Sequence, residues 1–166
     1  MEKFNTPIVK IKSDENYNDI YIKRDDLIPF SFGGNKVRIA NEFLEDMKSK
    51  NYTSIISYGS SKSNLNRAVS NLARANNINC YIVSPLDGQE KEESYNKELC
   101  LFSISKDNIF NSEVINVRKT IEKVIEISKN KGESPYYING KSDGTGNELI
   151  PVKAYEKCYE EILKYE

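Results

Sequence analysis

A lysine that follows a pair of glycines is the first feature of this sequence that could do chemistry. Phe32, Gly33, Gly34 and Asn35 lead into Lys36, where an amphipathic helix is expected to begin. Glycines let a ligand approach the backbone closely, and the free N–H groups of a helix start favour anions. The positive end of the helix should favour the neutral Lys36 amine, the form that makes a Schiff base with a carbonyl. A glycine turn followed by a surface lysine explains the same residues. This segment alone therefore does not distinguish a reactive lysine from a structural turn.

A second polar loop precedes the next expected helix. Ser63 stands where an N-cap is expected, and capping alone explains this residue. Asn64 and Leu65 follow in the first turn, where Asn64 has no capping role. The free N–H groups of such a turn could hold a carboxylate or a phosphate. Taken by itself, the loop fits both the capping and the binding interpretation.

Composition argues against several classes of function. The 166 residues include 24 Lys and Arg against 25 Asp and Glu, a net charge of -1, which does not suit an electrostatic nucleic-acid binder. Histidine is absent, which excludes Ser-His and Cys-His nucleophiles and argues against a metal site of the zinc type. We expect no membrane span, and the lack of a charged-then-apolar leader predicts a cytoplasmic protein. The three scattered cysteines are expected to be reduced and partly buried.

Strand-like and helix-like patterns alternate along the chain. Strands are expected over 19–25, 53–58, 80–84, 99–104 and 135–138. The first of them should be half-buried, because Ile20 and Ile22 alternate with polar or amphipathic residues. Helices are expected from 36, over 65–73, over 114–125 and from 151, whereas the charged segment 90–97 is ambiguous. This order predicts an α/β fold with an open, mainly parallel sheet and helices on both faces. Ligands of such sheets bind beyond the carboxyl ends of the strands, where both polar loops would lie.

Two further groups of residues are weaker candidates. Asp25 and Asp26 are adjacent carboxylates, but neighbouring strand positions point to opposite faces, so a joint acid–base role is not expected. Gly144, Thr145 and Gly146 could be read as a phosphate-binding loop. We interpret them as a plain connection before the last helix.

Taken together, the motifs resemble those of one family in order and spacing. They are the segments YIKRDDL at 21–27 and FGGNKVR at 32–38, followed by Ser63-Asn64 with Arg67. The chain resembles the 1-aminocyclopropane-1-carboxylate deaminase / D-cysteine desulfhydrase family of pyridoxal-phosphate enzymes. This resemblance covers most of the chain and implies a tryptophan-synthase-β-like fold.

The resemblance implies a role for each residue of the two loops. Lys36 would carry pyridoxal 5'-phosphate covalently and later move the substrate's proton, and Asn35 would brace the cofactor loop. Asn64 would hydrogen-bond the cofactor's ring hydroxyl. Ser63, with the backbone N–H groups of Asn64 and Leu65, would hold the substrate carboxylate. The implied reaction is deamination or desulfhydration of a small amino acid of the D-cysteine or 1-aminocyclopropane-1-carboxylate type.

The resemblance also implies that part of the family's chain is missing. Family members are about twice as long, and their phosphate-binding glycine loop and substrate tyrosines lie in the second half. We expect 1–50 to begin the large domain, 51–140 to form units like those of the small domain, and 141–166 to lead back to the large domain. We expect this chain alone to bind the cofactor weakly or not stably. Activity is expected to need a second polypeptide or a homo-oligomer. The alternative is a catalytically inactive fragment that acts as a binding or regulatory module.

Overall fold

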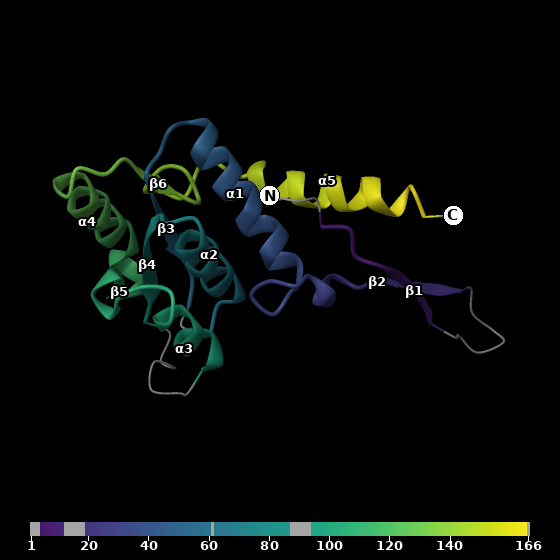
Figure 1. Cartoon of the computed structure of the whole chain (residues 1–166). Helices are drawn as coiled ribbons and strands as arrows, with labels where there is room; N and C mark the ends of the chain where they lie inside the picture. The colour runs from purple at the N-terminus through teal and green to yellow at the C-terminus, as the bar shows by residue number, and fades with distance from the viewer. Residues whose placement is uncertain (1–3, 12–18, 61, 87–93, 166) are drawn as a thin grey trace.

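A four-stranded parallel sheet forms the centre of the molecule (Figure 1). The computed structural model describes residues 4–11, 19–60, 62–86 and 94–165. The sheet has the order β5-β4-β3-β6, with strands β3 (Ser54–Tyr58), β4 (Asn79–Pro85), β5 (Ile109–Ser112) and β6 (Pro135–Tyr137). The helices are α1 (Asn35–Ser49), α2 (Asn64–Ala75), α3 (Tyr95–Leu101), α4 (Val117–Asn130) and α5 (Ile150–Ile162).

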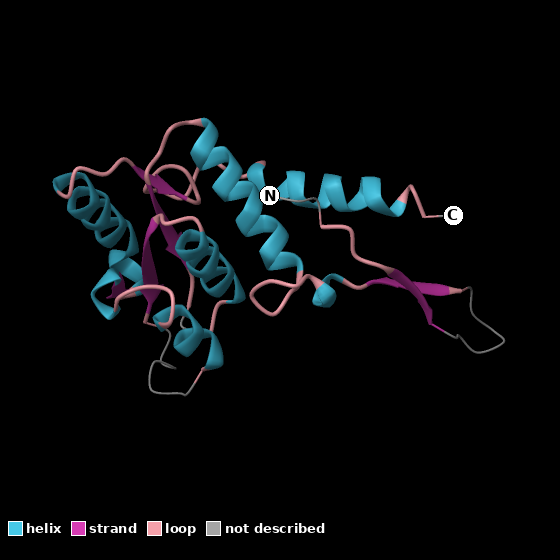
Figure 2. Ribbon diagram, viewed as in Figure 1, coloured by secondary structure: helices cyan, strands magenta, loops and turns pink. Residues whose placement is uncertain are grey.

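The sheet is covered on both faces, as the sequence predicts. α2 packs on β3 and β4 from one side, and α4 packs across all four strands from the other (Figure 2). The two central strands are buried over nearly their whole length, as expected for parallel strands covered on both faces. α1 packs against α2 and α5, and its Phe43 ring meets that of Tyr136 in β6. The predicted open α/β architecture is therefore confirmed.

The interpretation of 99–104 as a strand is wrong. Residues 95–101 form α3, in which Cys100 is buried while Leu99 and Leu101 are half-buried. A nearly continuous apolar run over so few positions fits a short helix as well as a strand. The missing strand is β5, which pairs with β4 through Ile82 and Ile109. Of the ambiguous segment 90–97, residues 90–93 lie outside the described part of the chain.

The strand expected at 19–25 is shorter and more exposed than predicted. β2 (Ile20–Lys23) pairs antiparallel with β1 (Ile8–Ile11) in a hairpin separate from the main sheet. Ile20 is 52% exposed in this hairpin, so the strand is not half-buried. Asp25 and Asp26 lie in a 3-10 turn and not at the strand positions expected, and they bind different partners, Arg38 and Arg24.

Three free cysteines are spread through the fold. Cys80 and Cys100 are buried and Cys158 is half-buried. Burial raises the pKa of the Cys80 and Cys100 thiols, which disfavours the nucleophilic thiolate. In the described part of the chain, no helix is both long enough and apolar enough to cross a membrane.

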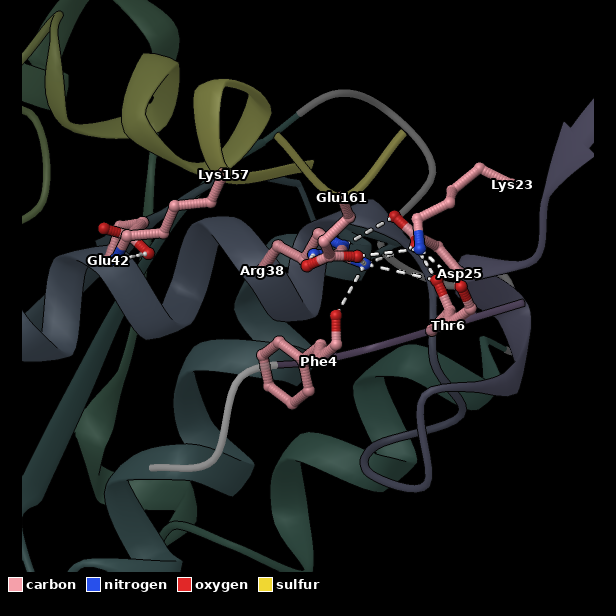
Figure 3. A network of polar contacts seen from close by, with 8 residues as sticks. All are labelled: Phe4, Thr6, Lys23, Asp25, Arg38, Glu42, Lys157 and Glu161. Atoms are coloured by element: carbon pink, nitrogen blue, oxygen red, sulfur yellow. Dashed lines mark hydrogen bonds and ion pairs between the residues drawn. The ribbon is translucent and has the colours of Figure 1, made fainter. Parts of the chain in front are cut away.

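A buried guanidinium joins α1 to segments near both ends of the chain (Figure 3). Arg38 is 5% exposed and forms bidentate contacts of 2.8 Å with Asp25, through Nε and Nη2. It also reaches Glu161 at the end of α5 with Nη1 at 2.8 Å and Nη2 at 2.9 Å. The Thr6 hydroxyl donates to Asp25, and the Lys23 ammonium lies 2.7 Å from Glu161. These five residues are called the Arg38 cluster below.

Arg38 and Glu161, two members of the Arg38 cluster, keep their charges in spite of burial. Burial lowers the pKa of Arg38, but hydrogen bonds to Glu161 and Asp25 outweigh it and raise that pKa above the ordinary value. Burial raises the pKa of Glu161, whereas hydrogen bonds from Arg38 and Lys23 lower it. The net result is a pKa below the ordinary value of 4.5. Such charge-assisted bonds are strong because donor and acceptor are both ionised.

Glu161→Gln is therefore expected to destabilise the protein by about 2 kcal/mol at neutral pH, because a charge-assisted bond is lost. A carboxyl whose pKa is lowered by folding stabilises the fold above its unfolded value and loses that effect as the pH falls. The difference from wild type should thus shrink below the ordinary glutamate pKa of 4.5. Urea unfolding across this range measures it, with the exposed Glu126→Gln as the control. A difference that does not change with pH would contradict the role of the Glu161 charge.

Candidate active site

The loop before α1 contains two glycines whose backbone conformations other residues rarely adopt. Gly33 has φ 65° and Gly34 has φ 90°, values in the left-handed region that disfavours side chains. A Cβ on Gly33 would lie 2.4 Å from the Asp26 carbonyl oxygen. A Cβ on Gly34 would have no described atom within 4 Å, while its N–H donates to the Asp25 carbonyl at 2.7 Å. The backbone is thus held in place and leaves open space beside Gly34.

Lys36 lies in the first turn of α1, directly after this open backbone. Its side chain is half-buried, and no residue in the described ranges makes a hydrogen bond or an ion pair with its ammonium group. Lysines of this chain that serve structure, such as Lys23 and Lys157, instead bind carboxylates. The Lys36 amine is therefore available to a ligand.

Asn35 faces the last helix. Its Nδ2 donates to the Tyr155 hydroxyl of α5 at 2.9 Å, which ties the start of α1 to α5. This contact braces the lysine loop from outside. The expected role of Asn35 toward the cofactor stays a prediction.

The second loop is capped as the sequence predicts. The Ser63 hydroxyl oxygen accepts the Asn66 N–H at 3.2 Å, so Ser63 is the N-cap of α2. Asn64 and Leu65 follow in the first turn, where Asn64 is exposed and Leu65 half-buried. Backbone N–H groups of a first turn have no partner within their helix, and the helix dipole makes them favourable to anions. The structure thus keeps these three residues together at one helix start.

Asn66 is a residue that the sequence analysis missed. It is 3% exposed, and its Oδ1 accepts the Ser57 hydroxyl at 2.7 Å. Its Nδ2 donates to the carbonyls of Gly59 at 2.9 Å and Ser60 at 3.3 Å, so it holds the turn between β3 and α2. The signal in the sequence is that Asn66 lies three positions before Val69 and so falls on the apolar face of α2. A polar residue on such a face is expected to be buried and hydrogen-bonded.

The structure brings the lysine loop against α2. The Arg67 guanidinium lies 5.7 Å from the centre of the Phe32 ring, and the Asn71 Nδ2 donates to the Ser31 hydroxyl at 2.8 Å. Both contacts join residues just before Lys36 to the helix that begins with Asn64. In Figure 1 the loop before α1 lies next to α2. The two loops singled out in the sequence therefore belong to one region of the surface.

The glycine-rich loop before α5 does not offer its N–H groups to a phosphate. The Gly146 N–H donates to the Glu148 carboxylate at 2.9 and 3.0 Å, and the Thr145 N–H donates to Asp143 at 3.0 Å. Two carboxylates at this turn would also repel an anion. This agrees with the interpretation of the segment as a plain connection.

Comparisons with known proteins agree with this geometry. A family model described as pyridoxal-phosphate dependent enzyme matches residues 1–166. A probable 1-aminocyclopropane-1-carboxylate deaminase of Cryptococcus neoformans is 33% identical over 152 residues, covering 83% of this chain and 44% of that protein. A D-cysteine desulfhydrase of Serratia proteamaculans is 29% identical over 113 residues, covering 66% of this chain and 33% of that protein.

A solved structure shows the same fold. The crystal structure of an ACC deaminase homologue superposes with a TM-score of 0.77 at 27% identity, covering 98% of this chain and 49% of that one. A hydrogen sulfide-producing enzyme from Fusobacterium nucleatum shares the fold with a TM-score of 0.65 at 20% identity. The chain spans less than half the length of the curated relatives that it matches.

The two glycines of the lysine loop give a matched pair of variants. Gly33→Ala should destabilise the protein by about 3 kcal/mol, because strain at positive φ is joined by a clash with the Asp26 carbonyl. Gly34→Ala meets no described atom and should cost only the backbone strain, about 2 kcal/mol at φ 90° and ψ 164°. Urea unfolding of both variants measures the difference. Equal losses would show that the loop does not have the backbone described here.

Proposed function

We propose, because the chain belongs to the family of pyridoxal-phosphate-dependent enzymes, that it forms the lysine-bearing part of a deaminase or desulfhydrase of a small amino acid. The observation that carries this proposal is Lys36, a half-buried amine without a described partner beside the open backbone of Gly34. The names of the relatives support a substrate of the 1-aminocyclopropane-1-carboxylate or D-cysteine type.

The residues of the two loops fit pyridoxal 5'-phosphate. Lys36 would hold the cofactor through its amine and would then move a proton at the substrate's α-carbon. Asn64 would donate from its side-chain amide to the oxygen on the cofactor ring. Once bound, the cofactor supplies an electron sink that lets a bond at the α-carbon break.

The start of α2 suits the carboxylate of an amino acid. Ser63 uses a lone pair to accept the Asn66 N–H, and its hydroxyl proton is left to be donated to a carboxylate. The N–H groups of Asn64 and Leu65 would add two further donors at the positive end of the helix. Ser63 thus fits two roles at once, as helix cap and as substrate-binding residue.

A second polypeptide is part of the proposal. The relatives are more than twice as long as their matched part, and a large apolar surface of this chain lies open. Side chains 40% or more exposed gather on the hairpin and on α5: Val9, Ile11, Ile20, Tyr21, Ile22, Val152, Tyr155, Tyr159 and Ile162. An isolated two-stranded hairpin is only marginally stable, so we expect it to be covered. We propose that the cover is a polypeptide equivalent to the unmatched part of the relatives, and that it supplies the missing phosphate ligands.

Covalent trapping tests the proposed function. The purified chain is mixed with pyridoxal phosphate and reduced with borohydride, and the modified lysines are identified by peptide mass. Labelling should concentrate on Lys36 and vanish in Lys36→Ala, because a preformed site orients this amine alone. The exposed Lys106 provides the control, since Lys106→Ala should leave the labelling of Lys36 unchanged.

A second arm adds the unmatched part of the Cryptococcus neoformans protein. Lys36 should then be labelled at a lower concentration of pyridoxal phosphate. The added polypeptide would supply partners for the cofactor phosphate, a dianion whose burial without partners is costly. Labelling scattered over surface lysines in both arms, with the same pattern in Lys36→Ala, would contradict the proposed function. That outcome would instead support a catalytically inactive binding or regulatory module.

A further inference from the structure

α3 lies along a polar stripe of α2. The stripe consists of Asn64, Arg67 and Asn71, which are spaced three and four positions apart and so share one face of the helix. At the start of α3, the Asn96 Nδ2 donates to Asn64 Oδ1 at 3.1 Å and to the Lys62 carbonyl at 2.8 Å. Just beyond its end, the Ser103 hydroxyl donates to Asn71 Oδ1 at 2.5 Å. Hydrogen bonds at the start of α3 and just beyond its end thus hold it along α2, from Asn64 to Asn71.

The contact with Asn96 determines which atom Asn64 presents to a ligand. A side-chain amide has one acceptor oxygen and one donor nitrogen, on opposite sides of the group. Asn96 occupies the oxygen of Asn64, so the nitrogen points away from Asn96. No described residue accepts a hydrogen bond from that nitrogen, and Asn64 is exposed. The Asn64 amide is therefore held ready to donate.

We propose that Asn96 is a positioning residue for the cofactor. It holds the Asn64 amide so that its N–H groups face the ring oxygen of pyridoxal phosphate, which is an acceptor. Through the Lys62 carbonyl it also holds the turn in which the cap residue Ser63 lies. This inference rests on the proposed function and adds to it a residue of α3 that touches neither cofactor nor substrate.

Two substitutions at Asn96 separate positioning from simple packing. Asn96→Asp replaces the donor with an acceptor, so the Asn64 amide should turn its nitrogen toward Asp and present its oxygen to the cofactor. Cofactor affinity, taken from the trapped fraction of Lys36 at increasing pyridoxal phosphate, should fall about tenfold, as expected for one lost hydrogen bond. Asn96→Ala leaves Asn64 free to turn and should weaken binding less. Glu98→Ala, an exposed change on the same helix, is the control and should have no effect.

A readout without cofactor tests the same contact. In NMR spectra of the free chain, the side-chain N–H resonances of Asn64 should shift in Asn96→Asp, because they then donate to a carboxylate, and should stay in place in Glu98→Ala. In an Asn64→Ala background, Asn96→Asp should weaken cofactor binding little further, since the residue acts through Asn64.

The outcomes separate this inference from the proposed function. If wild type and Asn96→Asp bind pyridoxal phosphate at Lys36 with the same affinity, the positioning role of Asn96 is overturned and the proposed function is not. Unchanged Asn64 resonances in Asn96→Asp overturn it as well, because the amide would then not depend on Asn96. A wild type that shows no specific labelling of Lys36 overturns the proposed function and this inference together.

Discussion

The position of the lysine loop depends on one buried charge. The Arg38 guanidinium cannot lie inside the protein without counter-charges, and it finds them in Asp25 and Glu161, 13 and 123 residues away. Asp25 also accepts the Gly34 N–H through its backbone carbonyl. The residue that neutralises Arg38 therefore fixes the backbone two positions before Lys36. Burying this charge also brings the end of α5 against the first turns of α1.

Much of the fold could be predicted from the sequence because its signals are local. The apolar runs of β3 and β4, the periodic helices and the Ser63 cap all depend on neighbouring residues. The short elements α3 and β5 could not be assigned, since a pattern over so few residues fits either period. The exposure of the hairpin could not be predicted either, because it depends on where the chain places β1 and β2 relative to the main sheet.

The candidate site divides in the same way. Lys36, Ser63 and Asn64 follow from glycine, capping and family patterns that can be read along the chain. Asn66 and Asn96 act through contacts with segments brought close only by folding, and nothing near Asn96 in the sequence indicates its partner Asn64. The positioning of a site by its surroundings is thus the part that sequence patterns describe least.

The chain has a polar surface at its two loops and an apolar surface on the hairpin and α5. The start of α2 and the lysine loop are polar, held by internal contacts and open to a ligand, whereas the hairpin and α5 expose apolar side chains. Both surfaces belong to a chain that spans less than half the length of the curated relatives that it matches. The Arg38 cluster explains how contacts within the chain hold the lysine loop in place, because Asp25 binds Arg38 with its carboxylate and the Gly34 N–H with its carbonyl.

Hydrogen exchange in Arg38→Met tests this explanation most directly. The change keeps a long side chain at the position and removes the charge that binds Asp25 and Glu161. In this variant the Gly34 and Val37 N–H groups, both bonded within the lysine loop, should exchange faster by a much larger factor than the Ile56 and Ile82 N–H groups in the sheet. An equal gain at all four positions would contradict it, because the cluster would then stabilise the whole fold without positioning the lysine loop.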